Sequence, residues 1–171
     1  MRFHPATTGH STLAAALFLL AGLGGCSPER EPPETIDLEV TAAFAAEPAT
    51  GERTALYFTV TNRGSDDDEL IAVSTEVAAT AEIHTTVRDG EMMRMEEVDA
   101  LLVRAGEVFR LAPGGIHIML LDLQETLRPG DRVNVTLSFR HAGDMLVRAE
   151  VVPYAELEEA LAEANDPAGT R

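Results

Sequence analysis

The stretch Arg132-Val-Asn-Val-Thr-Leu-Ser-Phe139 has the clearest alternation of apolar and polar side chains in this chain of 171 residues. The apolar set takes every second position and the polar set stands between, Val133, Val135, Leu137 and Phe139 against Asn134, Thr136 and Ser138. Successive side chains of a β-strand point to opposite faces. The pattern therefore predicts a strand with one face buried and the other in water.

Similar short segments lie on both sides of this strand, broken by turn residues about every 8 to 12 positions, which is typical of a β-sandwich or barrel. We find no convincing helical period between Ile36 and Val152. The turns contain Asn62-Arg63-Gly64-Ser65, Asp89-Gly90, Pro113-Gly114-Gly115, Pro129-Gly130-Asp131 and Ala142-Gly143-Asp144. The other predicted strands are Ile36–Phe44, Ala55–Asn62, Glu69–Ser74, Ala79–Val87, Met92–Val98, Val108–Leu111, Ile116–Asp122 and Met145–Val152.

The residues after Pro153 differ from the rest of the chain, because Tyr154, Leu157 and Leu161 recur at helical spacing among acidic residues. We expect residues 153–171 to form a short acidic helix, followed by a disordered tail from Asn165. The expected architecture is all-β with one short C-terminal helix.

The amino-terminal residues read as an export signal rather than as part of the fold. A basic Arg2 precedes an apolar run from Leu13 to Leu23, which is too short to span a membrane. The sequence Leu23-Gly24-Gly25-Cys26 resembles the bacterial lipoprotein signal, which implies lipidation of Cys26 and removal of residues 1–25. The alternative is an ordinary signal peptide that leaves Cys26 as a free thiol. Residues 26–35 are charged and rich in proline, which indicates a linker, and residues 36–152 form the predicted β-domain.

Charge and cysteine content exclude several classes of function. Of the 13 basic and 29 acidic residues, only Arg2 precedes Cys26, so the processed chain would carry a formal charge of −17. Such a charge opposes binding to nucleic acid and electrostatic docking to anionic lipid. With Cys26 assigned to the anchor, no cysteine is left for a disulfide, a thiolate metal site or a blue-copper centre.

Soft metal donors gather in two of the predicted strands. Met92, Met93, Met95 and Met119 lie in them, and His84 and His117 lie in or beside them. Residues i and i+2 of a strand share a face, so His117 and Met119 point the same way. The hairpin around Asp89-Gly90 can bring His84 from one arm and Met95 from the other.

Two imidazoles and two thioethers, without thiolate or carboxylate, suit Cu(I) better than Mg²⁺, Ca²⁺, Mn²⁺ or Zn²⁺. A neutral ligand set leaves the bound ion with one positive charge, which a partly exposed edge of an acidic protein can hold. Taken singly, a Met in a strand is more often core filling and a His more often an ordinary hydrogen-bonded side chain. Their joint placement favours a copper site.

The spacing H-x10-M-x21-H-x-M, from His84 through Met95 to His117 and Met119, resembles the signature of the periplasmic copper chaperones of the PCu(A)C family. The resemblance covers about Ile36 to Val152 and implies a cupredoxin-like fold, an immunoglobulin-like Greek-key β-sandwich. It implies that His84, Met95, His117 and Met119 bind Cu(I), with Met93 as an auxiliary candidate. Thr85 departs from the pattern, since many members of the family carry a second Met there. His141 stays unassigned.

The resemblance also implies a function outside the cytoplasm. We expect a copper chaperone, not an enzyme, anchored by lipid on the periplasmic side of a bacterial membrane and binding no nucleic acid. The implied acceptor is a cytochrome c oxidase copper domain, with a second copper-binding chaperone as a possible partner. The alternatives are copper storage or detoxification, and a lipid-anchored interaction or structural protein without metal.

Overall fold

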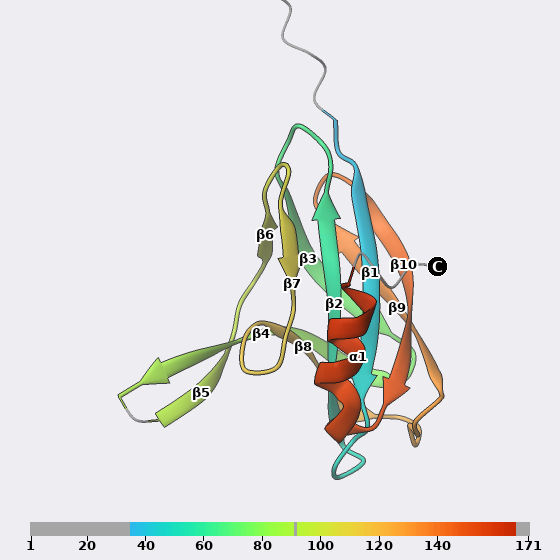
Figure 1. The fold of residues 1–171 in the computed structure, drawn as a ribbon. Helices are drawn as coiled ribbons and strands as arrows, with labels where there is room; N and C mark the ends of the chain where they lie inside the picture. Colours follow the sequence, from blue (N-terminus) through green and yellow to red (C-terminus); the bar gives the residue numbers. More distant parts are fainter. Residues whose placement is uncertain (1–34, 91, 167–171) are drawn as a thin grey trace, which may run out of the picture. The chain divides into compact units, whose positions relative to one another are not determined.

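The computed structural model describes residues 35–90 and 92–166. These residues form ten strands, a single 3₁₀ turn and one short α-helix, which confirms the all-β prediction (Figure 1). The elements in chain order are β1 Leu38–Ala46, β2 Arg53–Asn62, β3 Asp68–Thr75, β4 Ala78–Asp89, β5 Met92–Glu97, β6 Leu101–Val103, β7 Val108–Arg110, β8 His117–Leu123, β9 Arg132–Phe139, β10 Gly143–Val152, the 3₁₀ turn Tyr154–Glu156 and α1 Leu157–Ala164.

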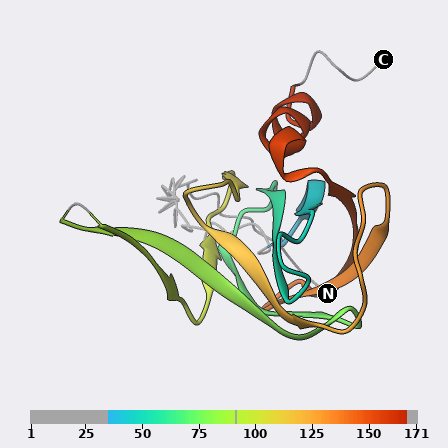
Figure 2. The ribbon, with the colours of Figure 1, turned by 90° about the horizontal axis from the view of Figure 1, so that it is seen from below.

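The strands pair in the order β5-β4-β8-β2-β1-β10-β9-β3-β6, and β7 pairs with β2. All pairs are antiparallel except β1 with β10. Strand β3 turns directly into β4 and packs near it, so the two halves of the sheet enclose a common interior. Figure 2 shows α1 standing outside the strands, and its contacts are with β1.

The alternating stretch behaves as predicted. Val133, Val135, Leu137 and Phe139 are all buried, whereas Arg132 and Asn134 are exposed and Thr136 and Ser138 are half-buried. Burial of one apolar face along β9 contributes roughly 25 cal/mol per Å² of apolar surface removed from water. The sequence pattern thus identifies the face of β9 that packs into the core.

The sequence pattern does not predict strand β6. It has only three residues and pairs with the end of β3. Its carbonyl at Val103 accepts a hydrogen bond from Nδ2 of the buried Asn62 at 3.2 Å. Three residues are too few for an alternation to be recognised.

The hairpin of β4 and β5 carries three of the six methionines of the chain. It turns at Gly90, whose φ of +64° lies in the left-handed region that favours glycine. Strand β5 pairs only with β4 and ends the sheet, and Figures 1 and 2 both show the hairpin extending away from the other strands. Three Met side chains therefore lie on an exposed edge hairpin.

The carboxyl-terminal prediction is correct for the helix and wrong in two details. Leu157 and Leu161 are buried as expected, but Tyr154 is 71% exposed because it lies in the 3₁₀ turn before α1. Asn165, predicted to begin a disordered tail, accepts a hydrogen bond from the Thr59 hydroxyl at 2.7 Å and donates one to the Leu161 carbonyl at 2.6 Å. The predicted tail from residue 167 onward lies outside the described residues.

Candidate metal centre

The pairing of β4 with β8 brings the two candidate imidazoles together. His84 lies directly opposite His117, and Glu82 lies opposite Met119. Side chains of directly paired residues point to the same face of a sheet. The ring centroids of His84 and His117 are 5.8 Å apart, with the ring planes inclined at 69°.

Met95 reaches the same face from the other side of β4. It lies opposite Thr86, two residues along the strand from His84, which makes it a diagonal neighbour of that imidazole. Met93 lies opposite Arg88 and shares the face of Met95, because both are two residues apart on β5. One face of β8, β4 and β5 therefore carries all four candidate ligands and the auxiliary candidate.

His117 is held by its backbone surroundings. It is 4% exposed, and its Nδ1 lies 3.1 Å from the Gly115 carbonyl oxygen. A carbonyl oxygen can only accept, so Nδ1–H donates and the neutral ring keeps its lone pair on Nε2. Burial lowers the pKa of His117, the Gly115 hydrogen bond opposes this shift, and the neighbouring His84 adds to it. The neutral form, which binds metal ions, is the favoured one.

His84 has one ring nitrogen bonded and one free. Its Nε2 lies 2.8 Å from Oε2 of Glu82, whereas its Nδ1 is buried without any hydrogen-bond partner. Buried polar atoms are nearly always satisfied, and an exception often marks the place of an ion or water. The unsatisfied Nδ1 of His84 is an observation independent of the sequence spacing, and it supports the fit of this donor set to a metal ion.

The exposure of the candidates is uneven. His117 and Met119 are 4% and 9% exposed, whereas Met95 and Met93 are 56% and 54% exposed. From the sequence we expect a partly exposed edge. That expectation fits β5, but it is wrong for the two candidates on β8, which are covered because both faces of this strand are buried. On this face, the thioethers of β5 are exposed, whereas the imidazole of β8 is buried.

Two residues at this face were not recognised from the sequence. Glu82 lies on the face of His84 and contacts its ring. Tyr57 is buried, and its ring lies 6.1 Å from that of His117. Burial raises the pKa of Tyr57 to about 12, with a smaller contribution from Tyr154. Tyr57 and His117 lie far apart in the chain, so only the register of β2 with β8 could have revealed their contact.

Harder donors do not gather anywhere in residues 35–90 and 92–166. Within those ranges, no group of three or more His, Cys, Asp and Glu side chains could hold a metal ion. The four candidate ligands themselves are imidazoles and thioethers.

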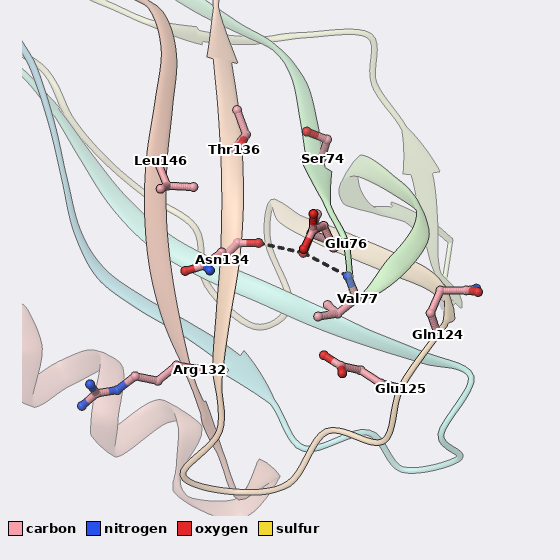
Figure 3. Close-up of a pocket in the computed structure, with 10 residues that line it drawn as sticks. Ser74, Glu76, Val77, Gln124, Glu125, Arg132, Asn134, Thr136 and Leu146 are labelled. Carbon is pink, nitrogen blue, oxygen red and sulfur yellow. Dashed lines mark hydrogen bonds between the residues drawn. The ribbon is translucent and has the colours of Figure 1, made fainter.

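A hollow of about 630 Å³ lies elsewhere, beside β3, β9 and β10. Figure 3 shows Glu76, Glu125 and Arg132 around it, and the Thr75 hydroxyl donates to the Asn134 carbonyl at 2.8 Å. None of the candidate ligands lines this hollow. It is therefore separate from the metal chemistry.

The predicted lipid anchor, Cys26, lies outside the described residues, as do the predicted signal sequence and most of the predicted linker. The helices within the described part of the chain are too short or too polar to cross a membrane.

A family model described as "Putative lipoprotein LpqE-like" matches residues 38–151. The chain belongs to the LpqE-like family. A protein of Leifsonia xyli subsp. xyli described as "Putative lipoprotein" is 30% identical over 156 residues, which cover 87% of this chain and 92% of that protein. This LpqE-like chain thus resembles that protein over most of its length.

Solved structures similar to this LpqE-like protein include PCuAC domains. The apo PCuAC domain from PmoF1 is 28% identical, with a TM-score of 0.60, over 70% of this chain and 98% of that domain. The solution structure of Cu(I)-bound DR1885 from Deinococcus radiodurans is 30% identical, with a TM-score of 0.54, over 72% of this chain and 81% of that protein. The copper-bound PCuAC domain from PmoF2 is 24% identical, with a TM-score of 0.60, over 70% of this chain and 97% of that domain, and supports the fold. The LpqE-like protein has the fold of these PCuAC domains, as the sequence resemblance implied.

Proposed function

We propose that this LpqE-like protein is a copper chaperone that binds one Cu(I) ion through His84, Met95, His117 and Met119. It acts as a carrier, not an enzyme, and delivers the ion to an acceptor such as a cytochrome c oxidase copper domain. The observation that carries the proposal is the direct pairing of His84 with His117 on the face shared with the two thioethers.

The chemistry of the donors supports Cu(I) as the cargo. Each imidazole has one nitrogen engaged by a protein oxygen, which leaves the other nitrogen as a donor. Thioethers are soft and uncharged, and they favour Cu(I) over harder divalent ions. The Cu(I) in DR1885 and the copper in the PmoF2 domain add support from proteins of the same fold.

The uneven exposure supports transfer. Met95 is the accessible candidate, whereas His117 and Met119 are buried. An acceptor ligand can replace an exposed thioether first, so the ion passes by stepwise exchange without a redox step. We further propose that lipidated Cys26 holds the domain at the periplasmic side of a bacterial membrane.

Copper transfer tests the function directly. Cu(I)-loaded protein mixed with an apo oxidase copper domain is expected to lose its copper to that domain, which is measured as copper in the two proteins after their separation. Retention of the ion in the presence of excess acceptor would favour storage or detoxification. A protein that is recovered without copper from copper-replete periplasm would favour the metal-free alternative.

The auxiliary role of Met93 gives a second expected result. Met93→Leu should weaken Cu(I) binding by up to about tenfold, equivalent to about 1.4 kcal/mol, because its thioether shares the face of Met95. Met92→Leu is the matched control, since Met92 points to the opposite face of β5 and is 72% exposed. Competition against a Cu(I) chelator measures both variants. Equal losses in the two would remove Met93 from the centre.

A further inference from the structure

Glu82 is the one carboxylate bonded to a candidate ligand in the described part of the chain. Its Oε2 lies 2.8 Å from Nε2 of His84, and the two side chains are 26% and 16% exposed. Glu82 also lies opposite Met119, within the same face. This carboxylate therefore sits inside the candidate centre, away from the freely solvated surface.

The surroundings of His84 select one tautomer of its ring. A carboxylate oxygen accepts hydrogen bonds, so a proton on Nε2 gives a good contact at this distance. A proton on Nδ1 instead would leave a buried donor without an acceptor and bring two acceptors together at Nε2. The Nε2–H tautomer avoids both costs, and it leaves the lone pair on Nδ1.

We propose that Glu82 is a positioning residue, which fixes the His84 ring so that Nδ1 is presented to the copper ion. The identity of the ligand, Cu(I), rests on the proposed function. The geometry rests on the 2.8 Å contact between Glu82 Oε2 and His84 Nε2 and on the unpartnered Nδ1. Carboxylates that bond the second nitrogen of a metal-binding imidazole set its tautomer, its orientation and its basicity. Glu82 is thereby a further functional residue of the site, beside the four predicted ligands.

The chain offers a matched control for the charge of Glu82. Glu97 is the residue directly opposite His84 on β5, and it is exposed. Its carboxylate makes no hydrogen bond to His84 in the described structure. Removing Glu97 therefore changes the local charge next to His84 and leaves the positioning contact intact.

The test uses Glu82→Leu, with Glu97→Leu as the control and Glu82→Thr as a second variant if the first does not fold. NMR of the imidazole nitrogens in the metal-free proteins, at about pH 8 and so above the ordinary pKa of imidazole, reports the tautomer of His84. Competition against a Cu(I) chelator reports affinity. We expect Nε2–H in the wild type and in Glu97→Leu, and a mixture of both tautomers when Glu82 is replaced.

Replacement of Glu82 should weaken Cu(I) binding by about 10- to 100-fold, the usual loss for an outer-shell partner, whereas Glu97→Leu should bind as the wild type does. An unchanged tautomer, or equal losses in the Glu82 and Glu97 variants, would overturn the role of Glu82. Failure of the wild type to bind Cu(I) would overturn the proposed function instead. The tautomer measured without metal would then still decide whether Glu82 orients the ring.

Discussion

The His117→Ala variant is expected to lose more Cu(I) affinity than the roughly 10- to 100-fold that removal of an outer-shell partner costs. His117 is the most buried of the four candidates, and its Nδ1 bond to the Gly115 carbonyl directs the other ring nitrogen as a donor. Its loss removes a proposed nitrogen ligand and leaves His84 without its paired imidazole. Competition against a Cu(I) chelator, with the folded state checked by circular dichroism, measures the change.

His141→Ala is the matched control for this variant. His141 is exposed in the turn between β9 and β10, and its backbone N–H donates to the buried Asp68 carboxylate at 2.9 Å. That contact does not involve the imidazole, so the substitution should leave both affinity and stability unchanged. A comparable loss of affinity in His141→Ala would mean that copper binds outside the face of β8, β4 and β5.

The Phe58→Ala variant is expected to have the largest effect on stability, a loss of about 3–5 kcal/mol in the free energy of unfolding. Phe58 is 1% exposed in the middle of β2 and belongs to the hydrophobic core. The substitution removes an aromatic ring from a closely packed interior, and the surrounding strands can collapse only in part. Chemical denaturation of the metal-free protein measures the loss.

Leu146→Ala provides the comparison for Phe58→Ala, because Leu146 also lies in a strand but is 74% exposed. Its truncation should change the free energy of unfolding by no more than about 0.5 kcal/mol. Similar destabilisation by the two substitutions would contradict the placement of the core. A loss of about 3–5 kcal/mol is a large part of the stability of a domain of this size.

The alternating strand β9 and most other strands could be predicted from sequence because burial of one face leaves a period of two in the residues. The same reasoning found His117 and Met119 on one face of β8. Strand β6 could not be predicted, because three residues are too few to show a period. The exposure of Tyr154 could not be predicted either, because this residue lies in a 3₁₀ turn and not in the first turn of the helix.

The contacts around the candidate centre depend on register, which one strand alone does not reveal. The opposition of His84 to His117 and the approach of Tyr57 to His117 both come from pairing between segments distant in the chain. The bond from Glu82 to His84 has a visible sequence signal, two polar residues at i and i+2 on a strand. The sequence alone could not show which nitrogen of His84 is left free.

The central claim is that two imidazoles and two thioethers on one face share a single Cu(I) ion. X-ray absorption at the copper edge of the Cu(I)-loaded protein tests it most directly, with the Met95→Leu, Met119→Leu double variant measured alongside. We expect one copper per chain with both nitrogen and sulfur neighbours in the wild type, and loss of the sulfur neighbours in the double variant. A wild-type spectrum without sulfur neighbours, or equal spectra for the two proteins, would contradict the claim.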